Sequence, residues 1–154
     1  MDKSPEEIIQ QHFDNTVSKL NAENDMEKQR LGNELNQKLS QVTPELFAEF
    51  LEGKGASHAC LSCGSNNLSV PETRIIDNSN LPEGFEKLQS SEQIDAIRCV
   101  TKRYVTYSFI ENEMMPRLGN VQYRVNCLNC GYVSFYRAYP AVQWVLASGA
   151  ESEE

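Results

Sequence analysis

The strongest constraint on the fold of this chain is a pair of matching cysteine knuckles, Cys60-Leu61-Ser62-Cys63-Gly64 and Cys127-Leu128-Asn129-Cys130-Gly131. Two intervening residues let both sulfurs of a knuckle reach one metal ion at about 2.3 Å, and the following glycine permits a tight turn. Two such knuckles supply the four thiolates of a tetrahedral site. We therefore predict that Cys60, Cys63, Cys127 and Cys130 bind one structural Zn²⁺ ion in a zinc ribbon.

Other uses of these cysteines stay open. A rubredoxin-like iron site employs the same four sulfurs, because ligand softness alone does not separate zinc from iron. Two disulfides or redox-active dithiols are a further alternative, but we expect a cytoplasmic protein without a signal peptide, and a reducing cytosol favours metal binding. The fifth cysteine, Cys99, is expected to be a small buried hydrophobic residue. His58, two residues before Cys60, is an alternative ligand.

The separation of the knuckles indicates an insertion. Residues 64–126 lie between them, whereas a compact ribbon has roughly 15 to 20 residues there.

Charge is distributed unevenly along the 154 residues, whose net charge is −8. Residues 1–54 hold eleven acidic and six basic side chains, residues 55–150 hold eight of each, and the last four residues add three acids. The flanks therefore repel phosphate, which excludes a generic, charge-driven nucleic-acid binder. The uncharged stretch near the C-terminus, residues 138–150, is interrupted by Pro140 and Gly149 and is too short to span a membrane.

The first 54 residues favour helix. Ser4-Pro5-Glu6-Glu7 is a helix start with a capping box, so a helix should begin at residue 5. Apolar residues then recur at eleven-residue spacing, close to three whole turns, and form one stripe. This stripe is the predicted assembly surface: Ile9, Phe13, Leu20, Leu31, Leu35 and Val42.

The stripe nearly vanishes over residues 21–25, which leaves two architectures open. One is a single helix over residues 5–41; the other is a helical hairpin folded at Asn21 to Asp25. A single helix cannot bury its stripe alone, so it pairs with a second chain, lies on a partner or packs on the ribbon. Thr43-Pro44-Glu45 starts a second, short helix, which we expect to cover the ribbon core.

The second half favours strands. Leu68 to Ile76 is strand-like but broken by Pro71, Phe85 to Ala96 is weakly helical, and Ile97 to Ile110 is dense in β-branched and aromatic residues. Val121, Tyr123 and Val125 alternate with polar residues on the strand that enters the second knuckle. We expect one antiparallel sheet, with Trp144 in a helix or strand that covers it.

The predicted fold class is therefore α+β, with an N-terminal long helix or helical hairpin followed by an antiparallel zinc-ribbon sheet that carries an insertion between the knuckles. The predicted units are residues 1–54 (helical or coiled-coil segment), 55–147 (zinc ribbon) and 148–154 (acidic disordered tail).

The second knuckle, with the run from Val125 to Arg137, resembles a family of small bacterial proteins described as predicted nucleic-acid-binding zinc ribbons, in which a similar Gly-Tyr-x-x-Phe-Tyr run follows the cysteines. The first knuckle is similar in outline. The resemblance covers about forty residues and implies the metal site and a nucleic-acid role. Ala141-Val142-Gln143-Trp144 is similar to the end of small phage restriction-alleviation zinc ribbons, which implies an inhibitor as an alternative.

Basic and aromatic residues also interleave in the second half, which is typical of a stacking platform for single-stranded nucleic acid. Cross-strand packing is the alternative interpretation. This candidate nucleic-acid or partner surface comprises Arg98, Lys102, Arg103, Tyr104, Tyr107, Tyr132, Tyr136 and Arg137, with Phe109 on the same predicted strand.

Enzyme motifs are missing from the sequence. It contains no phosphate loop, nucleophile elbow or H-E-x-x-H motif, so we expect no enzymatic activity. The remaining hypotheses are a non-enzymatic binding or adaptor protein and an iron electron carrier. The adaptor would engage a protein partner of nucleic-acid machinery, or nucleic acid itself, and assemble through its N-terminal helix.

Overall fold

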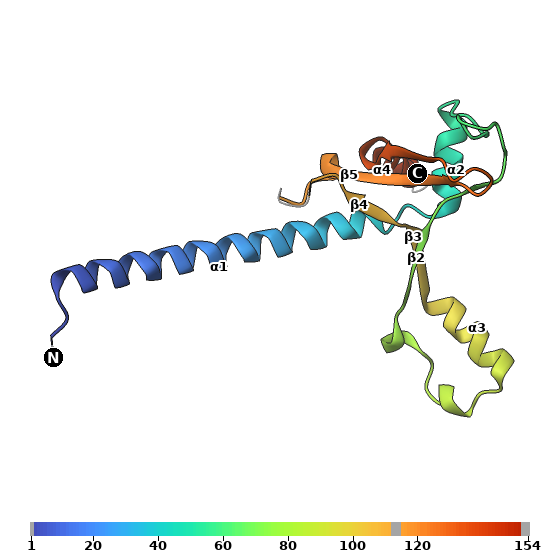
Figure 1. Ribbon diagram of the computed structural model, residues 1–154. Coiled ribbons are helices and arrows are strands. Elements are labelled where there is room, and N and C mark those ends of the chain that lie inside the picture. Colours follow the sequence, from blue (N-terminus) through green and yellow to red (C-terminus); the bar gives the residue numbers. More distant parts are fainter. Residues whose placement is uncertain (1, 112–114, 152–154) are drawn as a thin grey trace.

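A long helix, a compact body and a projecting arm make up the molecule (Figure 1). The computed structural model describes residues 2–111 and 115–151, with the side chains of residues 149–151 excepted. The mixed α+β class and the order of helix followed by antiparallel strands are as predicted.

Helix α1, Pro5–Leu39, is one continuous helix, so the alternative of a hairpin at Asn21 to Asp25 is wrong. It begins at the predicted capping box: the Glu7 N–H donates to the Ser4 hydroxyl, and the Ser4 N–H donates to the Glu7 carboxylate. Asn and Asp cost only fractions of a kcal/mol within a helix, so the polar stretch does not end it. The helix stops two residues before the predicted end at 41.

Helix α2, Pro44–Gly53, begins where the second start pattern predicted it. The Leu46 N–H donates to the Thr43 hydroxyl at 3.2 Å, and Pro44 occupies the first turn. Phe47 and Phe50 are buried on the side of the helix that faces the sheet. The expectation that this helix covers the core is confirmed.

The larger sheet is built around β5, Val121–Cys127. Strand β6, Val133–Arg137, pairs along residues 122–126 of β5, so β1, Leu68–Ser69, and β4, Tyr107–Phe109, share the opposite side of β5. All these pairs are antiparallel. Val121, Tyr123 and Val125 are buried as the alternation predicted.

One face of this sheet carries the core. Helix α4, Ala138–Glu151, packs with α2 and the end of α1 against Val121, Tyr123 and Val125. Its Trp144 lies on Phe50, with ring centroids 6.0 Å apart. Residues 148–151 of the predicted tail belong to α4, and residues 152–154 lie outside the described residues.

The arm is the insertion between the knuckles, and it corrects two predictions. Strands β2, Glu72–Ile76, and β3, Thr101–Val105, form a separate two-stranded sheet, so the prediction of one sheet is wrong. The predicted strand from Ile97 to Ile110 is wrong over its first four residues, which belong to α3, Ser90–Val100. A capping box of Gln89 and Glu92 starts that helix, and the local start outweighs the β-branched composition.

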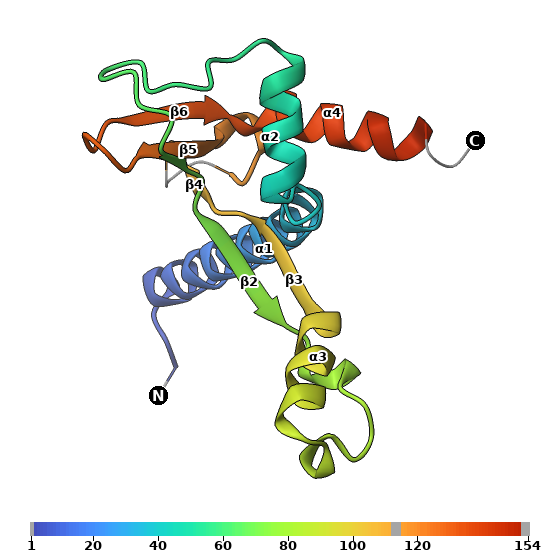
Figure 2. The same cartoon turned by 90° about the vertical axis from the view of Figure 1, so that its right-hand side faces the viewer.

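The tip of the arm carries short 3₁₀ turns at Asn78–Asn80 and Phe85–Lys87, and it extends away from the body in both views (Figures 1 and 2). Cys99 lies on α3 and is exposed, so the prediction that it is buried is wrong. Among the described residues, no helix combines the length and the apolar character that crossing a membrane requires.

Candidate metal centre

The two knuckles have the same backbone geometry. The glycine N–H donates to the carbonyl of the first cysteine in each, Gly64 to Cys60 at 2.9 Å and Gly131 to Cys127 at 3.0 Å. Both glycines have a positive φ, 75° and 82°, which L side chains rarely adopt. The turn that aims both sulfurs of a knuckle the same way therefore depends on glycine, as the sequence indicated.

Strand pairing brings the knuckles together. Leu68 of β1 lies opposite Cys127 of β5, and the Leu128 N–H donates to the carbonyl of Asn67 at 2.9 Å. The first knuckle precedes β1 and the second follows β5. An antiparallel pair of this kind places the two turns at the same end of the sheet.

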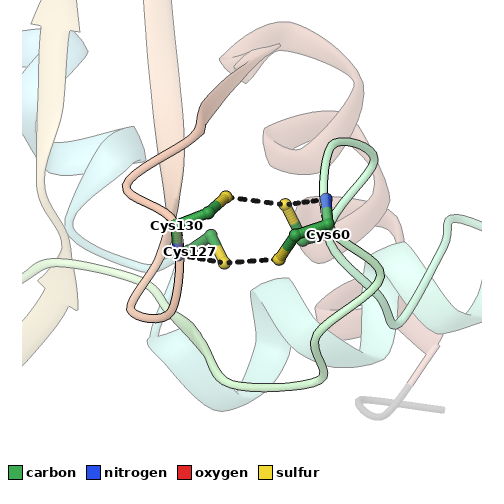
Figure 3. Close-up of side chains that lie close together, drawn as sticks. Cys60, Cys127 and Cys130 are labelled. Atoms are coloured by element: carbon green, nitrogen blue, oxygen red, sulfur yellow. Dashed lines mark hydrogen bonds between the residues drawn. The ribbon is translucent and has the colours of Figure 1, made fainter.

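The four predicted sulfur atoms meet at this end of the sheet. All lie within 4.8 Å of one another. Across the knuckles, Cys60 Sγ is 3.7 Å from Cys130 Sγ, and Cys63 Sγ is 3.7 Å from Cys127 Sγ (Figure 3). A disulfide needs about 2.05 Å, so these are free thiols.

The spacing fits a tetrahedral metal. A tetrahedron with metal–sulfur bonds of about 2.3 Å has edges of about 3.8 Å, close to the two measured separations. Four cysteines so placed can hold a metal ion. Their softness suits zinc and iron alike.

Backbone and side-chain N–H groups point at the sulfurs. Cys60 Sγ accepts from the Ser62 and Cys63 amides at 3.3 and 3.5 Å, and Cys127 Sγ accepts from the Cys130 amide at 3.5 Å. Asn129 Nδ2 donates to Cys63 Sγ at 3.4 Å. Donors of this kind stabilise thiolate over thiol, and thiolate is the form that ligates metal.

The thiol pKa values differ accordingly. The Asn129 side chain, followed by the Ser65 backbone N–H, lowers the pKa of Cys63 to about 6. The backbone N–H of Cys63 does most to lower the pKa of Cys60. At Cys130 the Tyr132 N–H lowers the pKa, but desolvation and the neighbouring thiols outweigh it and raise the pKa to about 11. The metal-free cluster is therefore only partly ionised at neutral pH.

The cysteine cluster lies at the protein surface, with two of its residues buried and two exposed. Cys60 and Cys127 are buried, and Cys63 and Cys130 are exposed. The described residues that can hold a metal together are these four, so neither His58 nor Cys99 joins them. His58 lines a neighbouring pocket, and Cys99 lies in the arm.

The candidate nucleic-acid surface is spread over several elements. Arg98 lies on α3, Lys102, Arg103 and Tyr104 on β3, Tyr107 on β4, Tyr136 and Arg137 on β6, and Tyr132 just before β6. Tyr104 is buried, Tyr136 packs on Phe47, and Tyr107 accepts a hydrogen bond from Asn36. Arg103 forms ion pairs with Glu72 and Glu45. The structure therefore does not gather these residues on one face.

The assembly surface is divided between solvent and core. Ile9, Phe13 and Leu20 are 70, 61 and 54% exposed, Leu31 is half-buried, and Leu35 is buried. Val42 follows the helix and belongs to the core. The eleven-residue spacing found the exposed stripe but continued it past the helix end.

Two features escaped the sequence reasoning. One is a pocket of about 220 Å³ beside the first knuckle, between α2, residues 56–61 and the sheet. The other is the open face of the sheet, where Phe135 is 59% exposed and lies opposite Arg124. The alternation along β6 could have indicated that Val133 and Phe135 lie on one face of the sheet and Ser134 and Tyr136 on the other. No sequence pattern indicated the pocket.

Comparisons of this chain with protein-family models, with curated proteins and with solved structures gave no match.

Proposed function

We propose that the four-cysteine cluster holds one structural Zn²⁺ ion and that the chain is a non-enzymatic binding or adaptor protein. The observation that carries the proposal is the meeting of four sulfurs within 4.8 Å, at cross-knuckle separations of 3.7 Å. Four thiolates complete a tetrahedral shell and leave no coordination position for water or substrate. A closed shell supports a structural role for the metal.

The place of the cluster supports the same role. Each knuckle continues into a strand of the larger sheet, and Cys60 and Cys127 are buried beside the core. A metal bound there would join the start of β1 to the end of β5. It would thereby fix the sheet face on which α2 and α4 pack.

The adaptor role rests on helix α1. Its N-terminal part extends far from the body (Figure 1) and exposes Ile9, Phe13 and Leu20. An unpartnered helix of this composition is marginal in water, so these side chains favour assembly with a second copy or a protein partner. Nucleic acid is the competing partner, and the net charge of −8 disfavours it.

Metal analysis of the purified full-length protein tests the proposal. We expect one equivalent of zinc and a colourless protein, whereas an iron tetrathiolate absorbs visible light and would support the electron-carrier alternative. The matched control is Cys99→Ser, which removes an exposed cysteine outside the cluster and should keep the full metal content. Less than half an equivalent of any metal would refute the proposal.

A further inference from the structure

Strand β6 has one free side. It pairs with β5 and forms the rim of the larger sheet (Figure 2). The Cys127 N–H donates to the Tyr132 carbonyl at 2.8 Å, and hydrogen-bonded pairs alternate along an antiparallel ladder. Ser134 and Tyr136 therefore bond to β5, while the N–H and C=O groups of Val133 and Phe135 point away from it. Within residues 2–111 and 115–151, no backbone group bonds to them.

A pocket adjoins this edge on the inner face of the sheet. It measures about 220 Å³, and Ser134 and Tyr136 of β6 line it together with apolar residues that include Leu51 of α2, Leu68 of β1 and Val70 just after β1. Sites for small molecules typically measure roughly 300–1,000 Å³. Glu52, Ser57 and His58 also line the pocket, but most of its surface is apolar, so its smaller size suits a single large apolar side chain.

The outer face beside the same edge is basic. Arg124 lies opposite Phe135, and Arg137 follows on β6; both are exposed. Neither forms an ion pair with a residue whose side chain the structure describes. The strand residues on this face include no acid: Ser69, Ser108, Gln122, Arg124, Asn126, Val133, Phe135 and Arg137.

We propose that the free edge of β6 binds an extended segment of a partner protein in which apolar side chains alternate with acidic ones. The segment adds a strand to the sheet through the N–H and C=O groups of Val133 and Phe135. One of its apolar side chains enters the pocket, and its carboxylates lie on the outer face beside Arg124 and Arg137. Backbone bonds supply affinity in this mode, and the alternating side chains supply specificity.

This inference deepens the binding role proposed above and rests on it. A second copy is the less suitable occupant, because its β6 and β5 would extend the outer face with a further Arg137 and Arg124 and with no carboxylate. An acidic segment neutralises that face.

Immobilised decapeptides test the proposal with the full-length, zinc-loaded protein. One set alternates Leu, Val or Phe with Asp or Glu, and the control set replaces the acids with Lys or Arg. We expect retention on the acidic set. Phe135→Pro removes an N–H that faces away from β5, and Phe135→Ala removes the side chain alone. The proline variant should bind about three- to tenfold more weakly than the alanine variant.

The pocket and the charge are tested separately. Ala48→Trp places an indole in the pocket, and Ala147→Trp on α4 is its control; only the former should weaken binding by tenfold or more. Arg124→Gln should weaken binding to the acidic set, and that loss should shrink as salt is raised.

Two results with the peptides would overturn the inference: no retention on the acidic set, or equal binding by the two Phe135 variants. Binding of a ten-nucleotide oligothymidylate at Arg124 that is tighter than binding of the acidic peptides would also overturn it. So would a dimer that forms without peptide and that Phe135→Pro dissociates. Zinc content is measured for every variant. A wild-type protein without metal would refute the proposed function, whereas a zinc-loaded protein that does not bind the peptides would refute only this inference.

Discussion

The two ends of helix α1 contrast sharply. Leu35 and Leu39 sit in the core against the sheet, whereas Ile9, Phe13 and Leu20, on the same helix and of the same chemical kind, are more than half exposed. The apolar periodicity of the sequence marks Leu35 in the same way as Ile9, Phe13 and Leu20, as a side chain that needs to be buried. The contrast teaches that a periodic stripe shows which side chains need a partner but not whether the partner is the chain's own body.

The metal is expected to have the largest effect, and it should act on the body alone. Structural zinc contributes about 10–16 kcal/mol in small domains. Chelation, or Cys127→Ser, should abolish near-ultraviolet circular dichroism, which reports the body because α1 contains no Trp or Tyr. Cys99→Ser is the control. Unchanged near-ultraviolet dichroism after complete metal removal would show that the body folds without metal.

Acidification should also act on the body rather than on helix α1, because it removes the metal. Bound metal holds the thiols ionised, so the stabilisation is present at neutral pH and is lost as pH falls and protons displace the metal. Because chelation is expected to unfold the body, the metal-free cysteines have the ordinary thiol pKa of about 8.5, and zinc binding at pH 7 should release nearly four protons. Zinc titrations in two buffers of different ionisation enthalpy measure this number, and release of about three would show that the cluster forms without metal, where the pKa of Cys63 is about 6.

A matched pair of phenylalanines sharpens the contrast within the fold. Phe47 is fully buried against Tyr123, with ring centroids 5.0 Å apart, and Phe47→Ala should cost about 3–5 kcal/mol of unfolding free energy. Phe13→Ala, at a 61% exposed position, should change the stability of the body by less than about 0.5 kcal/mol. Urea unfolding followed by Trp144 fluorescence compares them. A large cost at Phe13 in dilute protein would place that residue against the body.

Assembly through α1 is tested by a charge on the exposed stripe. Leu20→Glu should weaken self-association about ten- to hundredfold, because a buried apolar side chain contributes about 1.5–3 kcal/mol. Ala22→Glu adds the same charge on the opposite side of the helix and should have little effect. Light scattering at tens of micromolar measures both. A monomeric wild type with no protein partner would leave the stripe without a role in assembly.

The smallest expected effect concerns two tyrosine hydroxyls in the body. The Tyr123 hydroxyl is buried and has no hydrogen-bond partner among the described residues, so Tyr123→Phe should stabilise the protein by about 1 kcal/mol. The Tyr107 hydroxyl accepts from Asn36 of α1 at 2.8 Å, and Tyr107→Phe should cost about 1 kcal/mol. Thermal unfolding compares the two variants, and shifts of the same sign would contradict this assignment.

Local patterns predicted local structure well. The Ser4 and Thr43 caps, the glycine turns of the knuckles and the alternation on β5 each depend on a few neighbouring residues, and the structure confirms them. The cysteine spacing likewise predicted which four sulfurs meet, because few arrangements other than a shared metal use two such knuckles.

Features that depend on distant partners were beyond the sequence. Ile97 to Val100 have strand-like composition, but a capping box eight residues upstream sets their helix. Tyr104 and Tyr136 looked like members of a surface platform and instead pack into the body, because burial depends on which elements lie above each strand. The pocket beside β6 arises from three separate segments, none of which encodes it alone.

The arm leaves the body and returns to it at nearly one point. Thr106 N–H donates to the Pro71 carbonyl at 2.9 Å, and the Thr73 and Thr106 hydroxyls are 2.8 Å apart. The number of residues in the arm beyond these contacts should therefore have little effect on the metal centre, because doubling the length of a loop costs only about 0.6 kcal/mol in closure entropy. No residue of α3 is buried, so packing in the core does not constrain the amino-acid sequence at the tip of the arm either. Changes in the length or sequence of the arm beyond this point should therefore leave the two knuckles in place.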